Sequence, residues 1–353
     1  MSYSAEALAR RIGEVMADQP PMTVMEVCGT HTHAIRRWGI RQLLPGKLRL
    51  LSGPGCPVCV TDSAALGSAV ALARRPDTLV CSFGDMLRVP WGDTTLGAAP
   101  GARLAQSPMD ALRLAQACPD QQVVWFAVGF ETTTAHTAAL LEAAEKAGLT
   151  NLSVLCAHKT MPAALRSLLA GRRTVDGLLC PGHVAAVTGA EAFRFLPVEL
   201  GLPAAVAGFT PEDILLGLLA LASMRRRGLP DLVNAYPRAV KPEGNAQARA
   251  LTDRYFQPCA ARWRGLGEIP GSGLALRPGY AEYDALRRFP LSVPALPEPG
   301  GCRCGEILLG VCEPADCPHF GRDCTPEAPI GPCMVSSEGS CAAAWTYGEE
   351  TDG

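Results

Sequence analysis

Two short motifs bring together residue types that bind metals and exchange disulfides. In MEVCGTHTH, Cys28 stands close to His31 and His33, and in GPGCPVC two cysteines, Cys56 and Cys59, are separated by two residues. Thiolate sulfur and neutral imidazole nitrogen are common protein ligands of transition metals. A C-x-x-C pair is typical of a redox dithiol. The two motifs therefore predict a metal site, a redox site, or both.

The CPVC pair has three interpretations. It is a redox dithiol, or half of a zinc site completed by Cys28 and His31, or the zinc pair of a nucleoside deaminase. The deaminase needs an H-x-E motif upstream, and the run from His31 to His33 contains no Glu. A redox dithiol explains more, because it leaves Cys28 as a separate thiolate ligand. The zinc site stays open.

The C-terminal tail carries a second concentration of cysteine. Ligation by cysteine with little histidine is typical of an iron-sulfur cluster or of zinc held by four thiolates, and the spacing differs from that of bacterial ferredoxins. Four ligands leave three thiols over, so a C-x-C pair could hold a redox thiol beside a cluster ligand. This surplus favours a cluster with an adjacent disulfide. Seven of the fifteen cysteines lie here: Cys302, Cys304, Cys312, Cys317, Cys324, Cys333 and Cys341.

Composition limits the classes of function. The chain has 353 residues and a net charge of -2, which gives no electrostatic footprint for nucleic acid. No apolar run is long enough for a membrane span, and the N-terminus has the pattern of an amphipathic helix rather than of a secretion signal. We expect a cytoplasmic protein, with neither nucleic acid nor a membrane as a partner, whose thiols stay reduced.

Short apolar segments alternate with helical patterns over the first two thirds of the chain, which is typical of parallel α/β units. We expect an α/β fold with two similar parallel-sheet domains, residues 23–119 and 120–228, facing a cleft. Residues 1–22 should form a helix that packs on the C-terminal domain. Residues 229–353 should form a smaller, mainly helical or irregular iron-sulfur domain, with one helix over residues 245–265.

The chemically interesting residues follow predicted strands, and ligands of open α/β sheets bind beyond the carboxyl ends of the strands. Besides the two motifs above, Glu131 in GFETTT, His158 in CAHKT and His183 in CPGHV come directly after strands. We therefore expect one cleft that collects these side chains, although Glu131 could equally be a helix cap. The thiols of Cys28 and Cys59 should lie near helix N-termini, where the helix dipole favours thiolate.

Five motifs in order, CGTHTH, GPGCPVC, GFETT, CPGH and CTPEAPIGPCMVSSEGSCAA, resemble those of the HypD family of hydrogenase maturation factors. The resemblance covers nearly the whole chain. It implies a scaffold on which the Fe(CN)2CO group of [NiFe] hydrogenases is assembled, with a resident [4Fe-4S] cluster. It also implies two partners, the small chaperone HypC, which shares the iron, and HypE, which supplies cyanide. Such a protein is a redox-active assembly scaffold rather than a conventional turnover enzyme.

The resemblance also implies roles for single residues. Cys28 would ligate the iron while it carries cyanide and carbon monoxide, the two CGTHTH histidines would line its site, and CPVC would be a redox pair. Glu131 and His183 remain candidate catalytic residues of the same cleft. Electrons would pass from the cluster through dithiols to the incoming group. Cys312 fits no family role. In the tail, the implied cluster ligands are Cys302, Cys317, Cys324 and Cys341, and the implied redox pair is Cys304 and Cys333.

Two other classes of function remain open on the sequence. One is a stand-alone thiol-disulfide oxidoreductase that acts through Cys56 and Cys59, needs no iron at Cys28 and tolerates Cys28→Ala. The other is a zinc-stabilised binding scaffold with no redox role, which would be colourless when purified without oxygen.

Overall fold

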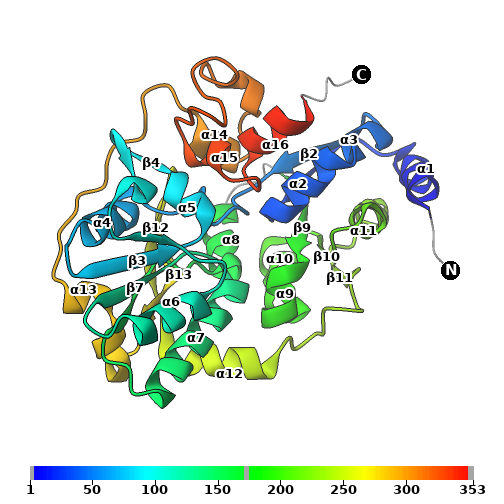
Figure 1. The fold of residues 1–353 in the computed structure, drawn as a ribbon. Coiled ribbons are helices and arrows are strands. Elements are labelled where there is room, and N and C mark those ends of the chain that lie inside the picture. Colours follow the sequence, from blue (N-terminus) through cyan, green and yellow to red (C-terminus); the bar gives the residue numbers. More distant parts are fainter. Residues whose placement is uncertain (1–3, 171–174, 349–353) are drawn as a thin grey trace.

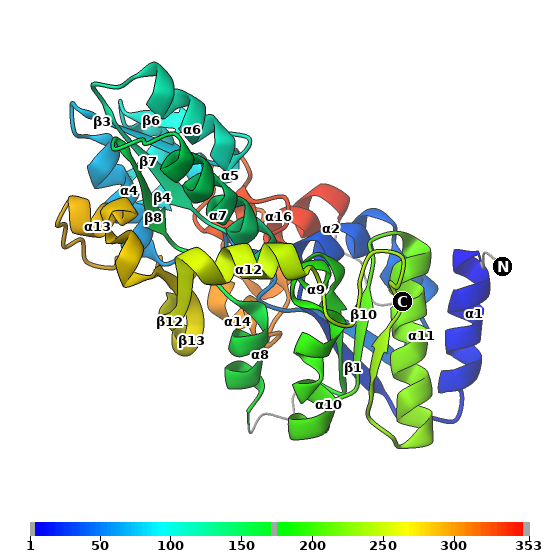
Figure 2. The ribbon, with the colours of Figure 1, turned by 90° about the horizontal axis from the view of Figure 1, so that it is seen from below.

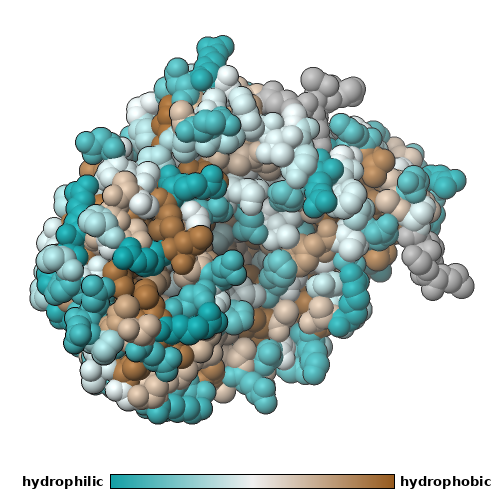
Figure 3. Space-filling model, in the orientation of Figure 1, coloured by the Kyte–Doolittle hydropathy of each residue, from teal (hydrophilic) through white to brown (hydrophobic). Residues whose placement is uncertain are grey.

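The computed structural model describes residues 4–170 and 175–348. It contains two parallel sheets, one of five strands and one of four, and two small antiparallel sheets. Figure 1 shows the parallel sheets in two lobes, with the C-terminal helices lying across one end of them. On the face seen in Figure 3, the surface is hollowed between the lobes. Within the described residues, no helix is both long enough and apolar enough to cross a membrane.

The five-stranded sheet combines strands from two distant parts of the chain. Its order is β11-β10-β9-β1-β2, and all its neighbours are parallel. Val24 of the central strand β1 aligns with Leu50 on one side and with Gly177 on the other. Most strand residues are buried, as expected for a parallel sheet that is covered on both faces. The strands are β1 (Met22–Glu26), β2 (Leu48–Ser52), β9 (Gly177–Pro181), β10 (Ala204–Ala207) and β11 (Leu232–Asn234).

The four-stranded sheet is formed by the part of the chain that lies between β2 and β9. Its order is β6-β3-β7-β8, again with parallel neighbours. Val80 of β3 aligns with Ala102 of β6 and with Val124 of β7. The strands are β3 (Thr78–Ser82), β6 (Ala102–Leu104), β7 (Gln122–Ala127) and β8 (Leu152–Cys156).

The sequence predicts that the two sheets divide the chain at residue 119, but they do not. The chain makes β1 and β2, crosses to build the whole second sheet, and returns to finish the first one with β9, β10 and β11. Each strand-helix unit has the same local pattern in either sheet, so the pattern predicts parallel strands but does not choose their neighbours. The expectation of two parallel-sheet lobes is confirmed, and the boundary between residues 23–119 and 120–228 does not match the strand pairing.

Helices cover the faces of both sheets. Several begin with the caps that their sequences predict: in the helix that follows Ser107, that residue and Asp110 form a capping box around Pro108. The helices beside the sheets are α2 (Gly29–Arg37), α3 (Ile40–Leu43), α4 (Ser63–Ala73), α5 (Gly84–Arg88), α6 (Pro108–Ala117), α7 (Glu131–Lys146), α8 (Met161–Leu169), α9 (Gly182–Thr188) and α10 (Phe195–Leu200).

The N-terminal helix packs on the five-stranded lobe. α1 (Ala5–Met16) lies against α11 (Pro211–Arg227), where Leu8 and Ile12 are buried in one cluster with Leu218. The expected packing of this helix on the C-terminal domain is therefore wrong. The apolar face of α1 predicts burial, but it does not specify the partner that buries it.

The segment expected to be one helix over residues 245–265 divides into a helix and a strand. α12 (Ala246–Tyr255) ends where β12 (Phe256–Trp263) begins, and β12 pairs antiparallel with β13 (Gly267–Leu276). Pro258 has no backbone N–H to continue a helix, and partly buried and exposed residues alternate along most of β12. Figure 2 shows α12 running from one lobe to the other, in contact with α7 and α9.

The C-terminal segment is short-helical and irregular, and it is tied to the five-stranded lobe. α16 packs on α2, and the carboxylate of Glu313 lies 3.6 Å from the guanidinium groups of Arg36 and Arg41 and 4.0 Å from that of Arg49. One hydrophobic cluster joins this segment to both sheets. Its helices are α13 (Ala285–Arg288), which contacts β8 of the four-stranded sheet, and α14 (Cys304–Leu308), α15 (Pro332–Val335) and α16 (Ser340–Tyr347).

Candidate functional site

Cys28 lies at the carboxyl end of β1, where it forms the N-cap of α2. The GPG loop that follows β2 packs directly on its backbone: the N–H of Gly29 donates to the carbonyl of Gly55 at 3.0 Å. A Cβ atom added to Gly55 would lie 2.3 Å from the Cys28 nitrogen, so only glycine fits there. The sequence therefore places the Cys28 turn and the start of the GPGCPVC loop side by side, as expected for neighbouring strand ends.

Two carboxylates surround the Cys28 turn. Glu26, fully buried beneath it, accepts hydrogen bonds from the Cys28 N–H at 3.0 Å and from the Thr32 hydroxyl. Burial raises the pKa of Glu26 to about 7. Glu338, from the C-terminal segment, accepts a hydrogen bond from the Thr30 hydroxyl at 2.6 Å. Its Cβ occupies the space in which a side chain at position 29 would lie.

The Cys28 thiol is not activated in the way the sequence suggests. It does stand at a helix N-terminus, but burial, and then the nearby charge of Glu338, raise its pKa to about 12. Two backbone N–H groups of the helix oppose this without reversing it. A metal ion that binds here must therefore displace the thiol proton.

His31 and His183 come together around an aromatic ring. The Phe209 ring contacts both imidazoles, with its centroid 4.9 Å from that of His31 and 3.9 Å from that of His183. The His31 Nε2–H donates to the carbonyl of Gly208 at 2.8 Å, and this tautomer leaves Nδ1 as a buried lone pair with no hydrogen-bond partner. Burial lowers the pKa of His31 to about 4, so the ring is neutral at pH 7.

The other two strand-end histidines face elsewhere. His33 donates from Nδ1 to the carbonyl of Ser337 at 3.3 Å and accepts at Nε2 from the Tyr347 hydroxyl at 3.1 Å, so it joins α2 to the C-terminal segment. His158 is buried, and its Nε2 accepts from the Thr137 hydroxyl at 2.9 Å. Both rings have structural partners.

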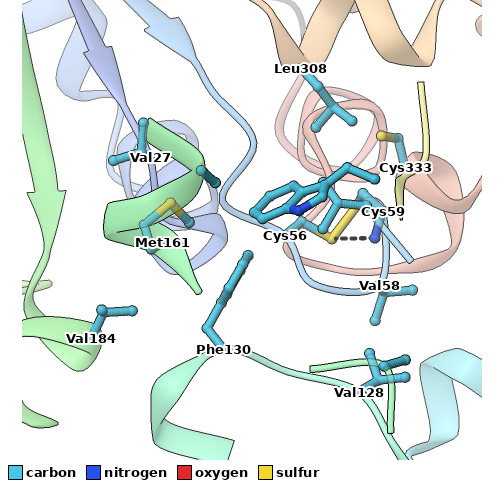
Figure 4. Packing of buried hydrophobic residues seen from close by; sticks show 14 of the residues in the cluster. Val27, Cys56, Val58, Cys59, Val128, Phe130, Met161, Val184, Leu308 and Cys333 are labelled. Carbon is cyan, nitrogen blue, oxygen red and sulfur yellow. Dashed lines mark hydrogen bonds between the residues drawn. A yellow bond between two sulfur atoms is a disulfide. The ribbon is translucent and has the colours of Figure 1, made fainter. Parts of the chain in front are cut away.

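Cys56 and Cys59 form a disulfide in a buried turn. Figure 4 shows it beside Phe130 and Cys333, within the hydrophobic cluster that joins the lobes to the C-terminal segment. The Cys59 N–H donates to the Cys56 sulfur at 3.2 Å. The expected position of Cys59 at a helix N-terminus is wrong, because α4 begins only at Ser63.

Glu131 caps a neighbouring helix. At the start of α7, it accepts with Oε1 the N–H of Met161, the first residue of α8, at 2.9 Å. Its Oε2 is buried without a partner, and burial raises the pKa of Glu131 to about 7. Of the two interpretations of this residue, the structure supports the cap.

The protonation of Glu131 should make stability depend on pH. The folded state holds the proton up to about pH 7, whereas the unfolded chain loses it near the ordinary value of 4.5. The protonated Glu131 carboxyl therefore adds about 3 kcal/mol to the free energy of unfolding below pH 4.5. This contribution is lost as the pH rises through 7. We expect Glu131→Gln, which keeps the acceptor for Met161, to remove this part of the slope. Urea unfolding of both proteins between pH 5 and 8 measures it, and parallel slopes would contradict the buried, protonated carboxyl.

All four implied cluster ligands line one cavity in the C-terminal segment. The cavity has about 330 Å³ of empty space, part of it open to solvent, and most of its other lining is apolar, including Phe320 and Ile330. Four thiols around such a space fit an iron-sulfur cluster, because each thiolate of a cluster binds a different iron. The four are Cys302, Cys317, Cys324 and Cys341.

The two remaining cavity thiols are a close pair. The sulfur atoms of Cys304 and Cys333 lie 2.9 Å apart, and both residues are buried. Cys312 is buried but does not line the cavity. Six of the seven tail cysteines thus line the cavity, two of them as a close pair, and Cys312 does not.

The side chains do not converge as a single zinc ion requires. Among the residues that the structure describes, no three Cys, His, Asp or Glu side chains meet around one point. Cys56 and Cys59, which a zinc site with Cys28 and His31 would need as thiolates, are bonded to each other.

Sequence analysis missed three residues of this region, Glu26, Phe209 and Glu338. Glu26 had a usable signal, because an acid at the end of an otherwise apolar strand is rarely buried without a reason. Phe209 follows β10 as the other site residues follow their strands. Glu338 had no signal, since only the folded chain brings it to Gly29.

Comparisons with known proteins agree on one family. Residues 3–348 match a family model described as HypD, "Hydrogenase formation hypA family". The chain is 46% identical to the hydrogenase maturation factor HypD of Azotobacter vinelandii, over 98% of this chain and 95% of that protein. It is 45% identical to the HypD of Rhizobium leguminosarum bv. viciae, over 98% and 93%. For the HypD of Escherichia coli K12, the identity is 41% over 94% and 90%.

Proposed function

This chain belongs to the HypD family of hydrogenase maturation factors, and we propose that it is the scaffold on which the Fe(CN)2CO group of [NiFe] hydrogenases is assembled. The observation that carries the proposal is the placement of Cys28, a buried thiol at a strand end that is packed against the loop of the Cys56–Cys59 disulfide. The iron group is the substrate, and Cys28 is its attachment point.

The chain itself offers few ligands to this iron. Cys28 supplies a sulfur, and the free Nδ1 lone pair of His31 can ligate a metal but cannot donate a hydrogen bond to a cyanide nitrogen. Since no third side chain of the described residues converges there, the other positions belong to cyanide, carbon monoxide and a partner. A small HypC-type chaperone sharing the iron fits this need, and HypE is the proposed cyanide donor.

The tail completes the proposal with redox chemistry. Cys302, Cys317, Cys324 and Cys341 would hold a [4Fe-4S] cluster, which supplies one-electron transfer when it is bound. Cys304 and Cys333 would form a redox-active dithiol beside this cluster. We propose that this dithiol exchanges with the Cys56–Cys59 disulfide, so that reducing equivalents reach the loop that packs on Cys28.

Infrared spectroscopy tests the assembly role. The protein is purified without oxygen together with its small chaperone, and the region in which metal-bound cyanide and carbon monoxide absorb is scanned. We expect bands from both ligands. A silent spectrum from iron-replete protein would favour the second candidate, a stand-alone thiol-disulfide oxidoreductase, which the Cys56–Cys59 disulfide keeps open.

A further inference from the structure

The turn between β12 and β13 contacts the segments of both dithiols. On one side, the N–H of Arg264 donates to the carbonyl of Val60, the residue after Cys59, at 3.0 Å. Thr61 and Trp263 form a β-bridge next to this bond. The CPVC loop is thus fastened to the turn through its backbone.

On the other side, the turn touches the residue that follows Cys304. A Cβ atom on Gly265 would lie 2.7 Å from the Cα of Gly305, and a Cβ on Gly305 would lie 2.7 Å from the carbonyl oxygen of Gly265. The two backbones approach so closely that neither residue can carry a side chain without movement. The close contact between Gly265 and Gly305 therefore fixes how near the Cys304 segment lies to the turn.

The turn itself is firmly anchored. Trp263 has no exposed surface, and its Nε1–H donates to the Ser272 hydroxyl at 2.8 Å. The Arg264 side chain is only 7% exposed and forms an ion pair with Glu298 at 3.0 Å. A turn with buried side chains holds the segments that it contacts in fixed positions better than an exposed loop does, because close packing leaves it few alternative conformations.

We propose that this turn positions the Cys56–Cys59 disulfide and the Cys304/Cys333 thiols for direct exchange, with Gly265 and Gly305 as the positioning residues. This inference rests on the thiol-disulfide exchange proposed above, and it identifies the turn as the element that positions the two cysteine pairs. Figure 4 shows Cys333, the partner of Cys304, near the Cys56–Cys59 disulfide.

The exchange is balanced within the chain. The Cys304 thiolate attacks one sulfur of the Cys56–Cys59 disulfide, breaking that bond and forming a mixed disulfide. Cys333 then attacks the Cys304 sulfur, which leaves a Cys304–Cys333 disulfide and two thiols in CPVC. The two protons given up by the attacking pair are taken up by Cys56 and Cys59. Two electrons move, and no outside oxidant or reductant takes part.

The test traps the mixed disulfide. In full-length holoprotein with Cys333→Ser, the second attack is blocked, so the bond between Cys304 and the CPVC loop should accumulate and be detected by mass spectrometry of the digested, alkylated protein. Adding Gly265→Ala should slow its formation about tenfold or more, because small misplacements of reacting atoms have large kinetic costs. Adding Gly305→Ala instead should also slow the formation of the mixed disulfide about tenfold or more, because it disturbs the same contact from the other backbone.

Gly267→Ala is the matched control. Gly265 and Gly267 both have positive φ, +72° and +84°, so alanine strains the backbone similarly at both, but a Cβ on Gly267 would meet nothing within 4 Å. We expect that variant to form the mixed disulfide at the parent rate. Equal rates in the Gly265 and Gly267 variants would overturn the positioning role. No mixed disulfide in the Cys333→Ser parent would instead overturn the exchange on which it rests, while the infrared bands report separately on the scaffold.

Discussion

Cys28→Ala should abolish the infrared bands of cyanide and carbon monoxide and stop hydrogenase maturation, while the iron and sulfide of the tail cluster remain. The reason is that Cys28 is the one cysteine of the CGTHTH turn and is the proposed ligand of the iron. Losing even an outer partner of a metal ligand typically costs about 10- to 100-fold in affinity or activity, so we expect loss of the ligand itself to bring maturation below detection. The measurements are infrared spectra of the anaerobic complex and hydrogenase activity in complemented cells.

Cys180→Ala is the control for this experiment. Cys180 is also a fully buried cysteine near a strand end, on the neighbouring strand β9, where it belongs to the hydrophobic cluster and has no role in the proposed assembly. It should mature hydrogenase normally, at a modest cost in stability for the lost sulfur atom. Normal maturation in Cys28→Ala would refute the iron-ligand role and move the function to the dithiol.

Cys341→Ala should remove the cluster. Cys341 is the only one of the four cavity thiols that lies on α16, the helix that packs on α2. We therefore expect both a loss of iron and acid-labile sulfide and a looser attachment of the C-terminal segment to the Cys28 turn. Iron and sulfide analysis measures the first effect. Hydrogen exchange of the α2 amides measures the second.

Cys312→Ala is the matched control for the cluster. Cys312 and Cys341 are equally buried, at 8% exposure, but only Cys341 lines the cavity. We expect the Cys312 variant to keep its full iron and sulfide content. Loss of the cluster in both variants, or in neither, would contradict the proposed ligand role of Cys341 as against Cys312.

The sequence predicts most of the elements but not their neighbours. Apolar segments such as TVMEV and VVWFA predict strands correctly, and the placement of Cys28 follows from β1 alone. The sequence does not predict that β1 pairs with β9. Paired residues such as Val24 and Gly177 are 153 residues apart, so no local pattern identifies them as partners. The helix expected through Pro258 fails for a local reason, since proline interrupts the helical hydrogen bonds.

The properties of the site residues depend on the same distant contacts. A helix N-terminus suggests a low pKa for Cys28, yet burial and the charge of Glu338 decide the result. His31 and His33 are close in sequence, but one faces the loop after β10 and the other faces the C-terminal segment. Residue type and spacing therefore locate such a site, and only tertiary packing determines the electrostatics of each group.

The order of strands also has a consequence for biosynthesis. A chain that emerges from the ribosome N-terminus first exposes Cys28 early. However, Gly177, where the neighbouring strand β9 begins, follows 149 residues later, and Glu338, which packs on the Cys28 turn, follows 310 residues later. Long-range parallel pairing of this kind forms late. A nascent or truncated chain therefore carries the thiol without its surroundings. Under the proposed function, we expect iron loading only after translation has reached Glu338.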